Sequence, residues 1–132
     1  MAHERMYDED DPLLLRLREL ALALPEATEK EAWGRPTFRC GKIFALYGGG
    51  VKVRPGEHEP HDRAVLFKAE PGETAALDED PRFFLPAYYG PFGWRGLDLD
   101  TPDVDWDEVR ELLDASFRLV ATRRAVKELD AR

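Results

Sequence analysis

The chain has 132 residues, of which 43% are hydrophobic and 35% charged, and its formal net charge is −8 at pH 7. This length and composition predict one globular domain and exclude a disordered chain, and no apolar run approaches the roughly 20 residues of a membrane helix. The start, MAHERMYDEDDP, is too acidic for a signal peptide, and Cys40 is the only cysteine, which excludes an intrachain disulfide. By elimination, we predict a cytoplasmic protein.

The first predicted elements are a mobile acidic leader, residues 1–10, and a helix that opens the single domain, residues 11–132. Asp11 is a typical N-cap and Pro12 a typical first helical residue. Pro25 ends the helix. Its apolar stripe recurs at helical spacing in Leu13, Leu17, Leu20 and Leu24.

Alternating patterns then predict strands at residues 28–33, 37–40, 43–47, 51–54 and 64–69. The tract Gly48–Gly50 is interpreted as a turn and residues 55–62 as a polar loop. A short helix over residues 71–77 follows. Two further strands, 83–85 and 94–99, flank an aromatic loop at residues 86–93.

A long terminal helix is predicted from Asp105 to Arg124, with Asp105 and Glu108 spaced as a capping box. The element order is α-β-β-β-α-β-β-α, allowing for one further hairpin. It predicts an α+β fold, a two-layer sandwich whose antiparallel sheet carries its helices on one face and leaves the other partly open. The residues expected to be buried together are Leu17, Leu20, Phe38, Phe67, Val109, Leu113 and Phe117.

Four segments of the chain resemble one known family. They are LPEATEKEAWGRPTFRCGKIFALY (residues 24–47), Phe67-Lys68-Ala69 before Pro71, Tyr88-Tyr89-Gly90 before Gly93-Trp94, and the helical run LLDASFRLV (residues 112–120). This order resembles the MmcQ/YjbR-like family of double-wing domains. The resemblance implies a two-layer α/β sandwich like that of secretion-chaperone-type proteins. It also implies a non-enzymatic binding domain with DNA as the ligand.

A basic segment is the first candidate site. Residues 33–70 carry seven basic and four acidic residues within an acidic chain. If Val51, Val53, Val65 and Phe67 face the core, the period of two directs the intervening side chains to the open face. This predicts a phosphate-contacting patch, or else an ordinary solvated sheet face. The patch comprises Arg39, Lys52, Arg54 and Lys68, with Lys42 at a hairpin tip.

Aromatic residues next to arginines form the second candidate site, for a protein or peptide partner. Trp33 and Arg35 are predicted either to stack on a partner or to pack in the core. The loop that contains Tyr88, Tyr89, Trp94 and Arg95 is either a binding loop or a cap whose rings fold back over the open sheet. Such a module can be a monomer or a homodimer.

Catalytic and metal-binding patterns are weak. His58 and His61 lie among acidic residues, but Pro60 prevents them from sharing a helical face. Cys40 has no assignable base, and Ser116 lies inside a predicted helix. We therefore predict no enzymatic activity, no metal and no cofactor.

Overall fold

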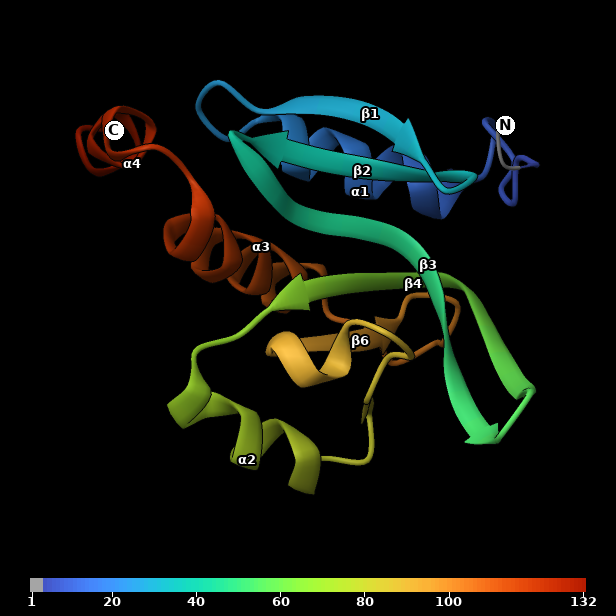
Figure 1. The fold of residues 1–132 in the computed structure, drawn as a ribbon. Coiled ribbons are helices and arrows are strands. Elements are labelled where there is room, and N and C mark those ends of the chain that lie inside the picture. The colour runs from blue at the N-terminus through green and yellow to red at the C-terminus, as the bar shows by residue number, and fades with distance from the viewer. Residues whose placement is uncertain (1–3) are drawn as a thin grey trace.

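One antiparallel sheet of six strands forms the centre of the computed structural model, which describes residues 4–132 (Figure 1). The strand order is β1-β2-β3-β4-β6-β5, and every neighbouring pair is antiparallel. The strands are β1 (Thr28–Ala32), β2 (Arg35–Cys40), β3 (Lys42–Arg54), β4 (Glu57–Lys68), β5 (Phe83–Phe84) and β6 (Trp94–Asp98).

Helices α1 and α3 pack on the same face of this sheet, as the sequence predicted (Figure 1). Their apolar stripes meet the buried side chains Phe38, Tyr47, Val65 and Phe67 in one core. The α+β sandwich is thereby confirmed. Between residues 4 and 132, no helix combines the length and the apolar composition needed to cross a membrane. The helices are α1 (Pro12–Leu22), α2 (Pro71–Glu79), the 3-10 turn η1 (Gly90–Phe92), α3 (Trp106–Val120) and α4 (Arg123–Asp130).

The predicted core is confirmed at six of its seven positions. Those six side chains are at most 1% exposed, whereas Leu20 is half-buried and packs against the edge of the core. Ser116, expected to pack inside its helix, joins the two layers. Its hydroxyl donates to the Phe44 carbonyl at 2.6 Å and accepts from the Lys68 amide at 2.9 Å.

The largest correction concerns residues 48–62, which were predicted as a turn, a short strand and a loop. They belong instead to a long hairpin of β3 and β4, whose turn is only Pro55 and Gly56. Val53, expected in the core, is 52% exposed. Residues 52–60 are exposed, so the alternation of Val51 to Arg54 does not mark a buried face, and residues 57–62 of β4 have no apolar alternation that would reveal a strand.

The terminal helix is also shorter than predicted. α3 ends at Val120, and Ala121 adopts an extended conformation. Thr122 then caps a separate helix, α4, by accepting a hydrogen bond from the Ala125 amide. A threonine N-cap inside an apparently continuous helical pattern is the signal for this break.

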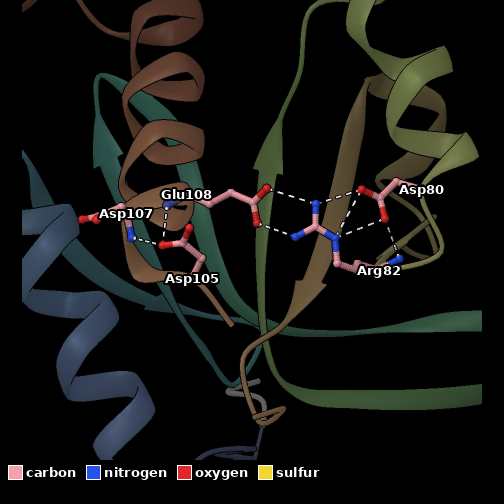
Figure 2. Close-up of polar contacts among 5 residues, drawn as sticks. All are labelled: Asp80, Arg82, Asp105, Asp107 and Glu108. Atoms are coloured by element: carbon pink, nitrogen blue, oxygen red, sulfur yellow. Dashed lines mark hydrogen bonds and ion pairs between the residues drawn. The ribbon is translucent and has the colours of Figure 1, made fainter. Parts of the chain in front are cut away.

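The predicted capping box forms only in part. The Asp105 carboxylate accepts from the amides of Asp107 and Glu108, as an N-cap should. The Glu108 side chain does not return to Asp105. Figure 2 shows it reaching across to Arg82, and Arg82 also pairs with Asp80. The two hydrogen bonds from Arg82 to Glu108 measure 2.8 and 3.1 Å. A bidentate ion pair therefore links α3 to the segment before β5.

The N-cap of α1 is fixed by a second bidentate pair. Asp11 accepts from the Leu13 amide at 3.0 Å, and Arg63 on β4 donates to both Asp11 oxygens at 2.7 and 3.0 Å. These bonds from Arg63 lower the pKa of the Asp11 carboxyl from 3.8 to about 2. The charged form is thus the one that the folded protein stabilises.

This pair predicts a pH-dependent stability. Because the pKa of Asp11 is depressed on folding, its contribution is complete above pH 3.8 and is lost as the pH falls toward 2. Asn caps a helix as well as Asp does, so Asp11→Asn isolates the charge. Allowing for the half-exposed Arg63, we expect a loss of about 1–2 kcal/mol at pH 7 and almost none at pH 2. Urea melts across this range test it, with Asp100→Asn, at an exposed carboxylate, as the control expected to cost little stability at pH 7. A loss that is the same at pH 2 and pH 7 would contradict the assignment.

Candidate functional site

A cavity of about 540 Å³ lies on the sheet face opposite α1 and α3, and we call it the open-face cavity. Its walls come from five segments: the N-terminal segment, the β1–β2 turn, the middle of β3, the start of β4, and the loop before η1. Nearby on the same face, Leu46, Leu66 and Trp94 form a small second core. The lining residues are Met6, Ala32, Trp33, Arg35, Leu46, Gly48, Gly49, Gly50, His58, Glu59, Pro60, Asp62, Ala87, Tyr88 and Tyr89.

Trp33 stands at the rim of the cavity and not in the core. It occupies the turn between β1 and β2 with a φ of 54°, a left-handed conformation that is uncommon for a bulky residue. Its side chain is 51% exposed. The alternative of core packing, left open by the sequence, is therefore wrong, because the tight turn directs the ring outward.

The N-terminal segment contacts this turn. The Met6 amide donates to the Gly34 carbonyl at 2.8 Å, which places Met6 in the cavity wall. Tyr7 donates to the Glu31 carboxylate on β1 at 2.6 Å. Residues 1–3 of the predicted leader lie outside the described residues. Its described end supplies part of the site.

The aromatic loop is attached directly to the glycine tract of β3. The Ala87 amide donates to the Gly50 carbonyl at 2.7 Å. Tyr88 follows with a φ of 70° and 78% exposure, and its ring stacks on His58 at 5.7 Å between centroids. Tyr89 is half-buried against Trp94, and burial raises the pKa of its hydroxyl. Of the two predicted roles for this loop, Tyr89 and Trp94 fulfil the cap over the sheet, and Tyr88 remains free for contact.

Arg35 forms the polar part of the cavity wall. Its Nη2 donates to Asp62 at 2.9 Å, and its side chain is only 13% exposed. The Nη1 atom is buried without an acceptor among the described residues. Gly48, at a φ of 92°, makes room for this guanidinium, because a Cβ there would overlap Nη1. The glycine that sequence reasoning assigned to a turn is therefore part of the site.

Trp94 and Arg95, predicted beside these residues, are interior. Trp94 is 8% and Arg95 7% exposed. The Arg95 guanidinium pairs with Asp78 of α2 at 2.6 Å and donates to the Gly90 carbonyl at 3.1 Å. These contacts hold the aromatic loop against the sheet, and neither residue lines the cavity.

The five basic residues predicted to contact DNA do not gather in one patch. Lys42 and Arg54 are the first and last residues of β3, a strand of 13 residues that follows the length of the sheet (Figure 1). Lys52 is exposed near the hairpin turn, where Arg54 pairs with Glu57 at 2.9 Å. Arg39 and Lys68 lie at the other end; Arg39 donates to Thr37 at 3.0 Å. The five side chains are therefore divided between the two ends of β3, and the charge of Arg54 is neutralised by Glu57.

His58 and His61 lie in different surroundings. His58 lines the cavity, whereas the His61 ring stacks on Phe84 at 4.1 Å and its Nδ1 lies 2.8 Å from Asp98. Among residues 4–132, no three or more His, Cys, Asp or Glu side chains gather in a way that could hold a metal ion. Cys40 is buried at the end of β2.

Comparisons with known proteins identify the family. The chain is similar in fold to the crystal structure of the Deinococcus radiodurans protein DR2400, which has a DUF419 domain. The TM-score is 0.59 at 21% identity, over 86% of this chain and 85% of that one. A comparison with curated proteins gives no match. The model of the family described as YjbR matches residues 22–119. The chain therefore belongs to the YjbR family.

Proposed function

We propose that this domain is a non-enzymatic binding module that receives a protein or peptide partner in the open-face cavity. The observation that carries the proposal is the placement of Trp33 and Tyr88. Both rings are more than half exposed at the rim of one cavity, and both backbones have a positive φ. Strained backbone and exposed rings each cost free energy, and together they are typical of binding surfaces.

The size and lining of the cavity support this role. A volume of about 540 Å³ falls within the range of ligand sites, which are mostly apolar with a few placed polar groups. Here the polar groups are the Arg35–Asp62 pair and His58, set among aromatic rings. Trp, Tyr and Arg are also the residues that most often dominate binding energy at interfaces.

The charge distribution favours such a partner over DNA. Nucleic-acid affinity depends on clustered cations that neutralise phosphates, but the five basic residues named above are divided between the two ends of β3. The net charge of −8 also repels a polyanion. We therefore do not propose DNA as the partner, and the experiment below would reveal DNA binding if it occurs.

Selection of peptides from a random display library on the wild-type domain tests the proposal. We expect selected peptides to lose roughly 10- to 30-fold in affinity for Trp33→Ala or Tyr88→Ala, as expected for interface anchors. Phe92→Ala is the matched control, because Phe92 is 71% exposed but does not line the cavity. The selected peptides should bind Phe92→Ala as tightly as they bind the wild type. The thermal unfolding midpoints of all three variants should stay close to that of the wild type.

Two results would overturn the proposal. One is that no selected peptide distinguishes the wild type from the cavity variants. The other is duplex DNA binding at low salt that Lys52→Glu/Arg54→Glu abolishes and Trp33→Ala leaves intact. Both basic side chains are exposed, so this charge reversal should not unfold the protein.

A further inference from the structure

We infer that the partner segment that enters the open-face cavity is basic, with an arginine or lysine side chain held between the aromatic rim and Glu59. This inference rests on the proposed function and adds the chemistry of the partner. Three features support a basic segment: the net negative charge of the cavity lining, the exposed rings of Trp33 and Tyr88, and Arg35 Nη1, which has no acceptor among the described residues.

The charges that line the cavity leave the Glu59 carboxylate with no Lys or Arg partner among residues 4–132; its Oε2 lies 3.7 Å from His61 Nε2. Arg35 is the only Lys or Arg among the lining residues, and it is paired with Asp62. Glu59 and Asp62 side chains are 63% and 54% exposed. One cation against two carboxylates leaves a net negative wall, within a chain of net charge −8 that attracts cations at longer range. An acidic partner would be repelled both by the cavity wall and by the net charge of the whole chain.

The aromatic rim provides faces that cations bind. Elsewhere this chain already places arginines over its rings: Arg16 lies 4.6 Å from the centroid of Trp106, and Arg5 lies 5.1 Å from that of Tyr7. No arginine or lysine of residues 4–132 lies over Trp33 or Tyr88 in this way. Among the aromatic side chains, indole gives the strongest interaction of this kind. An incoming cation would find the exposed Trp33 ring and the Glu59 carboxylate in the lining of the same cavity.

The Arg35 donor favours a peptide over an isolated cation. Nη1 is buried with no acceptor among the described residues, and a buried guanidinium nitrogen without a partner is costly. A main-chain carbonyl carries no net charge, so it can accept from Arg35 without repelling Glu59 or Asp62. Because Nη1 is covered in the free protein, a peptide carbonyl reaches it only when the guanidinium turns toward the cavity. A peptide would then supply both an acceptor oxygen and a cation.

Three synthetic peptides test the inference. They share one ten-residue frame of Gly, Ser and Pro, and carry Arg, Gln or Glu at the same four positions. NMR titration of the Trp33 indole N–H measures binding even at millimolar affinity, and Trp33→Phe assigns that signal. We expect the Arg peptide to bind at least tenfold more tightly than the Gln peptide. The Glu peptide should not bind, and added salt should weaken the Arg peptide.

Glu59→Gln is the decisive variant. We expect it to weaken the Arg peptide about three- to fivefold and to leave the Gln peptide unchanged. Glu57→Gln is the matched control, because Glu57 lies on the same strand but outside the cavity. Equal affinity for the Arg and Gln peptides, tighter binding of the Glu peptide, no binding of any of them, or no effect of Glu59→Gln would each overturn the inference. Display-selected peptides that need Trp33 but contain no basic residue would overturn it too, and would leave the proposed function intact.

Discussion

Phe117→Ala is expected to lower the free energy of unfolding by roughly 3–5 kcal/mol, the usual loss for a large core aromatic. Phe117 is fully buried on α3, where its ring meets Phe44 of β3 edge to face, with centroids 5.3 Å apart. The substitution removes both the buried apolar area and this ring pair. It also leaves a cavity between the helical layer and the sheet, which a rigid core can only partly fill.

Urea denaturation followed by far-UV circular dichroism measures this loss. Leu119→Ala is the control on the same helix, because the Leu119 side chain is 39% exposed and should cost much less. A loss below about 1 kcal/mol for Phe117→Ala would show that α3 does not pack on the sheet through this face. Alanine has the highest helix propensity, so neither substitution should weaken α3 itself. A comparable loss in Leu119→Ala would therefore contradict the difference in burial between the two positions.

The layers of the fold could be predicted because each has a local signal. Leu17 and Leu113 belong to stripes at helical spacing, and each stripe needs an apolar face to cover. Phe38 alternates with polar residues, which indicates a half-buried strand, and Phe67 ends a short apolar run, Ala64 to Phe67, of the kind found in buried strands. At the hairpin end, the alternation around Val53 wrongly indicated a buried face, since Val53 is 52% exposed, and the paired residues 57–62 carry no apolar signal at all. Its strands depend on pairing between β3 and β4, which composition does not reveal.

The residues of the cavity that could be predicted are those whose side chains cost free energy when they are exposed. Trp33 and Tyr88 drew attention because large rings in turns need a reason, and the structure places both at one cavity. Met6, Gly48 and Asp62 were missed because their roles depend on contacts between distant segments. Asp62, for example, meets Arg35 only through the register of β2, β3 and β4. Arg95, close in sequence to Tyr89, instead pairs with Asp78 of α2 and does not line the cavity.

Gly48→Ala is expected to destabilise the domain by roughly 2–4 kcal/mol and to weaken binding in the open-face cavity. Gly48 has a φ of 92°, and a left-handed conformation costs an alanine roughly 1–2 kcal/mol. The added Cβ would also overlap Arg35 Nη1 and would lie 3.0 Å from the Asp62 carbonyl oxygen. The guanidinium would then have to leave its ion pair with Asp62, a displacement costing roughly 1–3 kcal/mol in a packed site.

Two further variants separate these contributions. Gly56→Ala has a similar φ of 78° but nothing within 4 Å of its Cβ, so it should show the backbone cost alone, roughly 1–2 kcal/mol. In an Arg35→Ala background, Gly48→Ala should cost less, because the overlapping side chain is gone and only the backbone strain and the 3.0 Å contact with the Asp62 carbonyl oxygen remain. Chemical denaturation of the single and double variants gives the coupling energy between positions 35 and 48. If Gly48→Ala costs the same with and without Arg35, the guanidinium does not occupy the space that glycine leaves. A coupling energy above about 1 kcal/mol would show that the Arg35 guanidinium occupies the space beside Gly48. Peptide binding that is lost in Gly48→Ala but kept in Gly56→Ala would show that binding in the cavity depends on this placement.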